Sequence, residues 1–296
     1  MLVEDGAIIE ARILRHDITP AGTILAARLI ENGPLSVARA GEQEYLLPRR
    51  APGVTQGAML TIEVTREALA GAEPWKRPLA RVTDAAPAPA PEVVGVSVPF
   101  PSPFDPLEAA GWSDVIEEAR SGIVAFPGGE LRVALTPAMT LIDVDGHLPP
   151  EQLALAGAAA AARTIRRHGI SGSIGIDLPT ISGKVVRQAV AEAVDAILPA
   201  PFERTAMNGF GFLQIVRPRR WANLFELAAD RPAFEARALL RRAARETGAT
   251  ELVAHPALIA TLKPEWIDLL STQVGGAVSL RADPACRMAA GYAHRL

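Results

Sequence analysis

The 296-residue chain is predicted to fold as an α/β (α+β) protein in three parts: a small N-terminal β-barrel, a mixed-sheet core and a small α/β C-terminal domain. Three observations predict this class. Short apolar runs between turn residues fill positions 1–84, an Ala/Pro segment follows at 85–92, and strand-like runs then alternate with helix-like runs. With 49% hydrophobic and 21% charged residues, the chain has enough apolar side chains to bury a core.

Composition and the cysteine count exclude several classes of protein. No run of about 20 uncharged apolar residues is present, so we expect no membrane span. The N-terminal MLVEDGAIIEAR carries acidic residues where a signal peptide needs a basic segment. The single cysteine, Cys286, excludes an intrachain disulfide framework and any Cys-based zinc site. We therefore expect a cytoplasmic protein that holds no zinc.

Residues 1–84 are predicted to form a small OB-like β-barrel. They contain the runs GAIIEARIL, TILAARLI, YLLP and MLTIEVTRE, which are separated by the turn signals TPAG, NGP and APGVTQG. Oligonucleotide-binding barrels usually expose aromatic side chains that stack on bases, and this part offers only Tyr45 and Trp75. We interpret the barrel as structural and leave RNA binding by it open. Residues 85–97 follow as an extended Ala/Pro linker.

The core is predicted to begin with an amphipathic helix in WSDVIEEARSG. Two β-runs follow, GGELRVAL and AMTLIDV, and the Thr136-Pro137 turn between them favours an antiparallel pair. An Ala-rich helix over 151–168 ends at Gly169, and the buried-strand run GSIGIDL comes next. Because a helix joins this run to the preceding strand, we expect it to be parallel to a neighbour.

Three aspartates mark the ends of these β-runs. Asp143 and Asp145 are two positions apart, so a strand directs both side chains to one face and Val144 to the other. Asp177 ends the next strand at its carboxyl end, where sheets of this kind place ligands. Carboxylate oxygens suit Mg²⁺, which can promote phosphodiester hydrolysis. The alternative is that these carboxylates only solvate a loop or cap a helix.

Basic residues gather near the predicted core elements. Only three of the thirty basic residues are lysines, so arginine, whose planar guanidinium suits phosphate, dominates. Arg163, Arg166 and Arg167 crowd one helix end, where a basic last turn also suits the helix dipole. Lys184 opens the helix after Asp177, where it either meets phosphate or is simply solvated.

Four segments together resemble the catalytic core of the ribonuclease E/G family over roughly 100–220. They are GGELRVALTPAMTLIDVDG, the Arg-ended helix, GISGSIGIDL and FERTAMNGFGFLQIVRPR. The later PAFEARALLRRAARETGATELVAHPALIATL resembles the small domain that follows the core in those enzymes. The resemblance implies a DNase I-like catalytic core at 98–220 and a small α/β C-terminal domain at 221–296.

The resemblance also implies roles for particular residues. The family's two magnesium-binding aspartates fall on Asp143 and Asp177, and Asp145 stands where the family has an asparagine. That change keeps an oxygen ligand and adds a negative charge. Contacts with RNA are implied at Phe210, Arg217 and Arg219.

Other positions depart from the family pattern. Gly209, Gln214 and Thr180 replace an arginine, a glutamate and an acidic residue, respectively. No cysteine lies between Arg220 and Ala233, so a zinc-linked dimer is not expected and any homo-oligomer forms in another way. The family also has a large segment that senses the RNA 5′ end. In this sequence the linker runs almost directly into the core, so that segment has no room.

Two functions therefore follow as expectations. The first is a magnesium-dependent endoribonuclease that cleaves single-stranded RNA to 5′-phosphate and 3′-hydroxyl ends in RNA processing or decay. The alternative is a catalytically decayed member of the same fold that has an RNA-binding or regulatory role. Convergence of the three aspartate carboxylates would favour the first.

Overall fold

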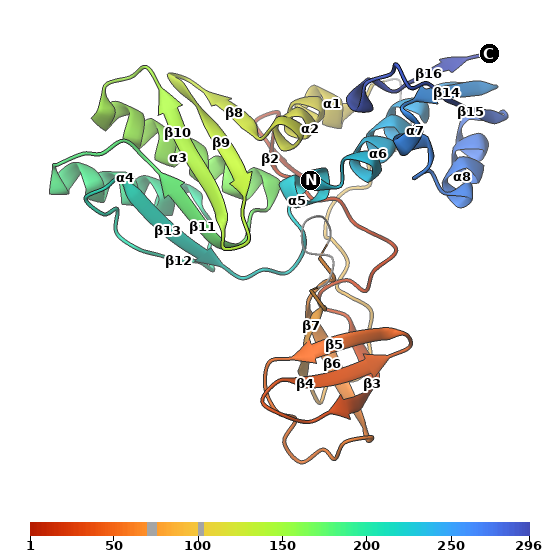
Figure 1. Ribbon diagram of the computed structural model, residues 1–296, viewed down its shortest axis with the longest axis horizontal. Coiled ribbons are helices and arrows are strands. Elements are labelled where there is room, and N and C mark those ends of the chain that lie inside the picture. The colour runs from red at the N-terminus through yellow and green to blue at the C-terminus, as the bar shows by residue number, and fades with distance from the viewer. Residues whose placement is uncertain (70–75, 100–103) are drawn as a thin grey trace. The chain divides into compact units, whose positions relative to one another are not determined.

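The computed structural model describes residues 1–69, 76–99 and 104–296. Contacts divide the chain into two compact units. The first comprises Met1–Gly95 with Gly111–Phe225, and the second comprises Val96–Ala110 with Glu226–Leu296. Both units mix helices and strands, which confirms the predicted α/β class (Figure 1). The boundaries drawn from the sequence after residues 84, 97 and 220 stay predictions.

A closed five-stranded barrel forms in the N-terminal region, as predicted. Its strand order is β3-β4-β5-β7-β6. The strands are β3 (Ile24–Glu31), β4 (Ser36–Ala40), β5 (Gln43–Leu47), β6 (Met59–Arg66) and β7 (Leu79–Val82). Alternating apolar residues in β6 place Leu60, Ile62 and Val64 inside the barrel. Tyr45 is also buried there, with its hydroxyl on Thr19 Oγ1, so its ring cannot stack on a base; Trp75 lies outside the described residues.

The run GAIIEARIL does not join the barrel, which corrects one expectation. Its first part forms β2 (Ala7–Glu10), which pairs with β1 (Leu2–Glu4) as a separate hairpin. Asp5 and Gly6 both have positive φ, the conformation that the tightest hairpin turns require. The local Asp-Gly turn therefore pairs β2 with β1 and not with a barrel strand.

The central sheet has six strands in the order β12-β13-β11-β10-β9-β8. They are β8 (Ile123–Phe126), β9 (Gly129–Leu135), β10 (Thr140–Gly146), β11 (Gly172–Asp177), β12 (Glu203–Arg204) and β13 (Phe212–Arg217). β9 and β10 form the expected antiparallel pair, and β10 and β11 are the expected parallel neighbours. The helix α3 (Pro150–His168) connects β10 to β11 and ends at Gly169 with φ 69°, as predicted.

Helices cover one face of this sheet. α3 packs against β9 and β10, and α4 (Lys184–Ile197) packs beside α3 (Figure 1). The strand side chains in the resulting core include Ile142, Val144, Ile174, Ile176, Leu213 and Ile215. α3 comes so close to the sheet that a Cβ on Gly157 would lie 2.3 Å from Val144 Cγ1. The predicted amphipathic helix α2 (Trp112–Ser121) is also present.

The second unit has its own three-stranded sheet, in the order β15-β14-β16. The strands are β14 (Thr250–Ala254), β15 (Val278–Ala282) and β16 (Tyr292–Arg295). Its helices are α1 (Pro106–Ala109), α6 (Arg231–Ala243), α7 (Pro256–Ile259) and α8 (Pro264–Val274), with the short η1 (Met288–Ala290). The boundary between the two units falls within α5 (Leu224–Ala229), after Phe225. Leu239, Leu252 and Leu270 lie in the core between helices and sheet. Among the described residues, no helix combines the length and apolar character needed to cross a bilayer.

Candidate active site at the carboxyl edge of the central sheet

Two of the predicted aspartates lie side by side at one edge of the central sheet. Asp143 on β10 is the direct register partner of Asp177 on β11, and the two strands run parallel. Neighbouring strands lie about 4.8 Å apart, and register partners direct their side chains to the same face. This face is the one opposite α3, because the intervening Val144 and Ile176 are buried in the helix-covered core. The expected alternation of Asp143, Val144 and Asp145 is confirmed.

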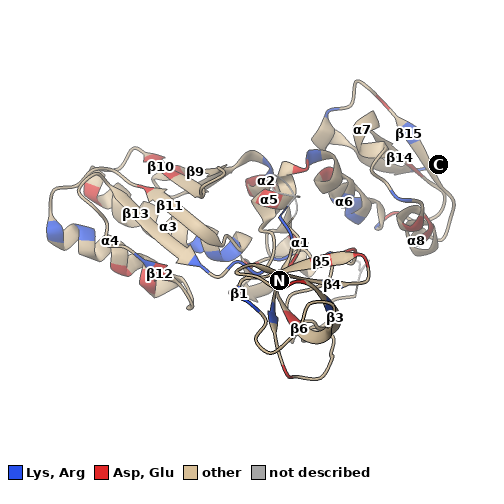
Figure 2. Ribbon diagram, turned by 60° about the horizontal axis from the view of Figure 1, so that its bottom comes forward, with Lys and Arg blue, Asp and Glu red and all other residues tan. Residues whose placement is uncertain are grey.

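β9 adds charged residues on the other side of Asp143. Its Arg132 is the register partner of Asp143, and its Glu130 is the partner of Asp145. Arg132 Nε lies 3.6 Å from Asp145 Oδ2, and the same guanidinium is 2.7 Å from Glu130 Oε1. Both side chains of the Arg132–Asp145 pair are about 60% exposed, at 60% and 62%. The Arg132 guanidinium is therefore the positive group beside the carboxylates of Glu130 and Asp145. Acidic residues colour the end of β10 red in Figure 2.

This crowding changes the protonation of Asp143. Partial burial raises the pKa of the Asp143 carboxyl above its ordinary value, and the charges of Asp145 and Asp177 raise it further. Arg132 opposes this rise. A carboxylate that its neighbours make harder to ionise is one for which an added cation is favourable.

The donor set fits magnesium with two protein ligands. Within the described residues, no group of three or more His, Cys, Asp or Glu side chains is close enough to hold a metal ion. Mg²⁺ commonly takes one or two carboxylates and completes its shell with waters and substrate phosphate. Asp143 and Asp177 meet that need because they are adjacent, directed to one face and mutually repelling. Asp145 lies at the exposed rim of the pair.

Phe210 lies in a loop that the structure ties to the end of β11. Asp177 is the register partner of Phe212, and the Leu178 backbone N–H donates to the Gly211 carbonyl. Asn208 Oδ1 accepts the backbone N–H groups of Phe210 and Phe212. The Phe210 side chain is 86% exposed despite this rigid backbone. An aromatic ring in such a setting can stack on a nucleobase.

Lys184 opens α4 at the same edge of the sheet. The helix begins after the short segment that follows Asp177, and Lys184 is exposed in its first turn, which is blue in Figure 2. Arg187 is held by the carbonyls of Ile181 and Ser182. Lys184 thus presents an exposed cation near a helix N-terminus, where the helix dipole also favours an anion.

The structure does not bring Arg217 and Arg219 to this edge. Arg217 is the register partner of Gly172, at the opposite end of β11 from Asp177. Five residues of strand span about 16 Å. Arg217 also lies on the helix-covered face, donates to the Ile170 carbonyl, and has a pKa lowered mainly by burial. A Cβ on Gly172 would lie 3.6 Å from Arg219 Cδ, which places Arg219 at the same distant end. Direct participation at the carboxylates is therefore not supported for either arginine.

The arginines at the end of α3 serve mainly as structural partners. Arg166 Nε donates to Glu10 Oε1 at 2.8 Å, and Arg167 contacts Glu118 Oε1 at 3.1 Å. The Arg167 carbonyl also accepts the Ala11 backbone N–H. With Arg163 they line a pocket of about 270 Å³. The first cluster found in the sequence thus joins α3 to the N-terminal hairpin and α2.

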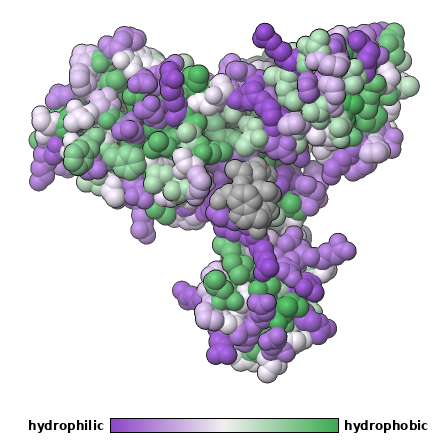
Figure 3. Space-filling model, in the orientation of Figure 1, coloured by the Kyte–Doolittle hydropathy of each residue, from purple (hydrophilic) through white to green (hydrophobic). Residues whose placement is uncertain are grey.

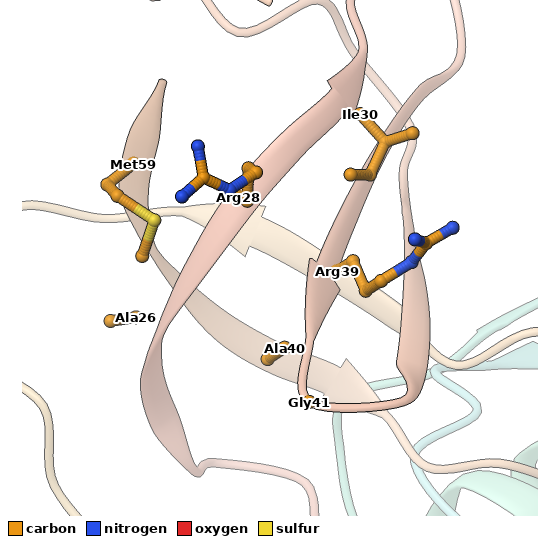
Figure 4. A pocket seen from close by; sticks show the side chains of 7 residues that line it. All are labelled: Ala26, Arg28, Ile30, Arg39, Ala40, Gly41 and Met59. Carbon is orange, nitrogen blue, oxygen red and sulfur yellow. The ribbon is translucent and has the colours of Figure 1, made fainter. Parts of the chain in front are cut away.

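A second arginine-lined pocket lies on the barrel (Figure 4). Arg28 on β3 is the direct register partner of Arg39 on β4 and of Met59 on β6. The pocket measures about 360 Å³. Arg39 is paired with Glu44 at 2.5 Å, and Arg28 donates to the Gly57 carbonyl at 2.7 Å. Figure 3 shows hydrophilic and hydrophobic residues mixed over the visible surface of the barrel.

Sequence reasoning missed Arg132 and Glu130. The hairpin between the predicted strands GGELRVAL and AMTLIDV could have revealed them. Leu135 pairs with Thr140 across a four-residue loop, and this pairing sets the register of the two strands. Counting back from that loop places Arg132 opposite Asp143.

The chain matches no family model, and no curated protein matches it significantly. The ribonuclease E/G resemblance therefore stays a hypothesis.

Proposed function

We propose that the carboxylate edge of the central sheet hydrolyses phosphodiester bonds of single-stranded RNA with the help of Mg²⁺. The observation that carries the proposal is the register of Asp143 with Asp177 on adjacent parallel strands. It puts two oxygen-ligand side chains on one open face, where partial burial and, after it, the charges of Asp145 and Asp177 raise the pKa of Asp143. A bound divalent cation would relieve this repulsion.

Each residue at the edge has a role in the proposal. Asp143 and Asp177 hold the ion, and Asp145 helps directly or through water. When bound, Mg²⁺ supplies charge neutralisation and polarisation of a phosphoryl oxygen. Lys184 attracts the phosphate backbone, and Phe210 supports an unpaired base by stacking.

The resemblance to ribonuclease E/G supports the same function. It implies a DNase I-like arrangement of the core and hydrolysis that leaves 5′-phosphate and 3′-hydroxyl ends. The pairing of Asp143 with Asp177 supports the proposal because the resemblance assigns the metal ligands to these two residues. A cytoplasmic role in RNA processing or decay follows from the same proposal, with magnesium and no zinc.

The test is a cleavage assay with single-stranded A/U-rich RNA. Purified protein is incubated with labelled RNA in MgCl₂ or in EDTA, and product ends are identified by their reactivity with RNA ligase. We expect cutting in MgCl₂ only, with ligatable 5′-phosphate ends. RNA that binds and stays intact in MgCl₂ would overturn the hydrolase proposal.

One observation favours the alternative, a catalytically decayed RNA-binding or regulatory protein. Gly209, Gln214 and Thr180 stand where the family pattern has charged residues. This alternative predicts RNA affinity that falls steeply with salt. It also predicts that Asp143→Asn and Asp177→Asn leave RNA levels in cells unchanged.

A further inference from the structure

The three-stranded sheet of the second unit presents a face that differs from its apolar helix-covered side. Leu252, Ala254 and Ala293 lie in or against the core under the helices. Strand alternation therefore turns the intervening residues to the opposite face. In register rows, that face carries Arg281, Val253 and Tyr292, followed by Ser279, Glu251 and His294.

Three planar groups are exposed on this face. Tyr292 is 48% exposed, and the side chains of His294 and Arg281 are 43% and 48% exposed. The Tyr292 and His294 rings lie with centroids 5.8 Å apart and planes tilted by 34°. The two rings and the guanidinium occupy a surface built on regular strands, so their backbone positions are fixed.

Hydrogen bonds hold the guanidinium across the central strand. Arg281 Nε donates to Glu251 Oε2 at 2.9 Å, and the same guanidinium donates to the Tyr292 hydroxyl at 3.4 Å. Val253 lies in the row between Arg281 and Tyr292 and is fully buried. Glu251 is largely covered, with 21% of its side chain exposed, and His294 Nε2 lies 3.7 Å from it. The carboxylate therefore serves to orient its neighbours, while the planar groups face outward.

We propose that this face, defined by Tyr292, His294 and Arg281, is a stacking surface for unpaired bases of single-stranded RNA. Aromatic side chains on an open sheet are a recurrent way to stack successive bases, and a guanidinium adds both a flat surface and a positive charge for phosphate. Because Arg281 forms an ion pair with Glu251, its guanidinium contributes mainly a flat surface beside the two rings. The surface is independent of hydrolysis at Asp143 and Asp177, so it belongs to the proposed nuclease and to a non-catalytic RNA-binding protein alike.

The test measures RNA binding by the full chain in EDTA, where cleavage does not occur. Fluorescence anisotropy is read with labelled single-stranded RNA and with a duplex of the same sequence. Because stacking contributes about 1 kcal/mol or more per base, the double variant Tyr292→Ala/His294→Ala is expected to weaken single-strand binding at least about five-fold. Unchanged affinity would overturn the proposal, as would equal binding of duplex and single strand.

Two variants separate stacking from folding. Tyr292→Phe keeps the ring and removes the hydroxyl that Arg281 contacts, so affinity is expected to stay close to that of the parent protein. Leu269→Ala removes an apolar side chain that is 69% exposed on α8 and serves as the matched surface control. Photocrosslinking with 5-iodouridine RNA is expected to label the peptide containing Tyr292 and His294. Absence of crosslinks in that peptide, with crosslinks elsewhere, would contradict the assignment.

Discussion

Asp143 and Asp177 are direct register partners on parallel strands, and their carboxylates share one face and one edge of the central sheet. This relationship depends on the α3 crossover, which carries the chain from the carboxylate edge back to the opposite edge, so that β11 runs parallel to β10 and ends beside Asp143. Loops would not fix two carboxylates in this way, since the strand backbone on both sides is hydrogen-bonded. The backbone positions of the proposed metal pair are therefore set by strand pairing.

Asp143→Asn and Asp177→Asn are each expected to reduce magnesium-dependent RNA cleavage by about 100-fold or more. A bound ion contributes several kcal/mol to the transition state, and each 1.4 kcal/mol corresponds to a tenfold change in rate. The measurement is kcat/KM on single-stranded RNA over a range of MgCl₂. Asp84→Asn, which changes an exposed carboxylate outside the sheet, is the control. Equal activity in all three variants would exclude the carboxylate edge as the active site.

Asp143→Asn is also expected to stabilise the fold at neutral pH. The folded-state pKa of Asp143 is raised, chiefly by burial, so the ionised carboxyl lowers the free energy of unfolding above that pKa. As pH falls through the raised pKa toward the ordinary value, the folded protein takes up the proton first and the parent recovers stability. The gain in the variant therefore fades in that acid window. Its size is at most about 1 kcal/mol, because the site is largely open to solvent.

Thermal unfolding of parent and variant at a series of pH values checks this sign. MgCl₂ is expected to raise the melting temperature of the parent more than that of the variant, because the ion binds only the folded state. A variant that is less stable than the parent at neutral pH would contradict the electrostatic account.

The barrel and the alternation at Asp143 and Asp145 were predictable because period-2 patterns are local properties of a strand. The separate N-terminal hairpin was not predicted, since the apolar run of β2 also fits a barrel strand, whereas β2 pairs with β1 across the Asp5-Gly6 turn. Apolar pattern alone does not choose between two possible partners of a strand.

Arg217 illustrates a different limit. It is the last residue of β13. The antiparallel pairing of β13 with β11 then carries that end away from Asp177 and brings Phe212 there instead. Strand direction is set by tertiary topology, which no local window of sequence contains. Arg132 was missed for the related reason that its importance comes from cross-strand register.

Gly211→Ala is expected to destabilise the loop that carries Phe210, while Gly209→Ala is expected to be nearly neutral. Gly211 has φ 96°, and a Cβ there would lie 2.1 Å from the Leu178 carbonyl oxygen. No atom lies within 4 Å of the corresponding position at Gly209. Strain of this kind typically costs about 1–3 kcal/mol, and the backbone clash adds to it. Denaturant unfolding of the two variants measures the difference, and equal stabilities would show that the loop geometry is wrong.

Phe210→Ala is expected to weaken RNA binding without loss of stability. The side chain is 86% exposed, so its removal changes the free energy of unfolding by no more than about 0.5 kcal/mol. Loss of one stacked base costs about 1–3 kcal/mol, which corresponds to a rise in KM of at least about five-fold. Phe210→Tyr is expected to retain binding. Val94→Ala, at a fully exposed apolar position, is the control, and an unchanged KM in Phe210→Ala would remove this residue from the RNA path.

Lys184→Gln and Arg217→Gln are expected to have opposite effects on binding and stability. Lys184 is exposed at the proposed RNA edge, so its loss removes one phosphate contact and lowers the slope of log K against log salt by about 0.7 for a single strand. Arg217 instead donates to the Ile170 carbonyl in a half-buried position far from Asp177, so its loss is expected to cost about 1 kcal/mol of stability and leave the slope unchanged. Binding titrations at several salt concentrations, paired with denaturant unfolding, measure both quantities. A slope that falls with Arg217→Gln and not with Lys184→Gln would place the RNA at the other end of β11 and reverse the proposed direction of binding.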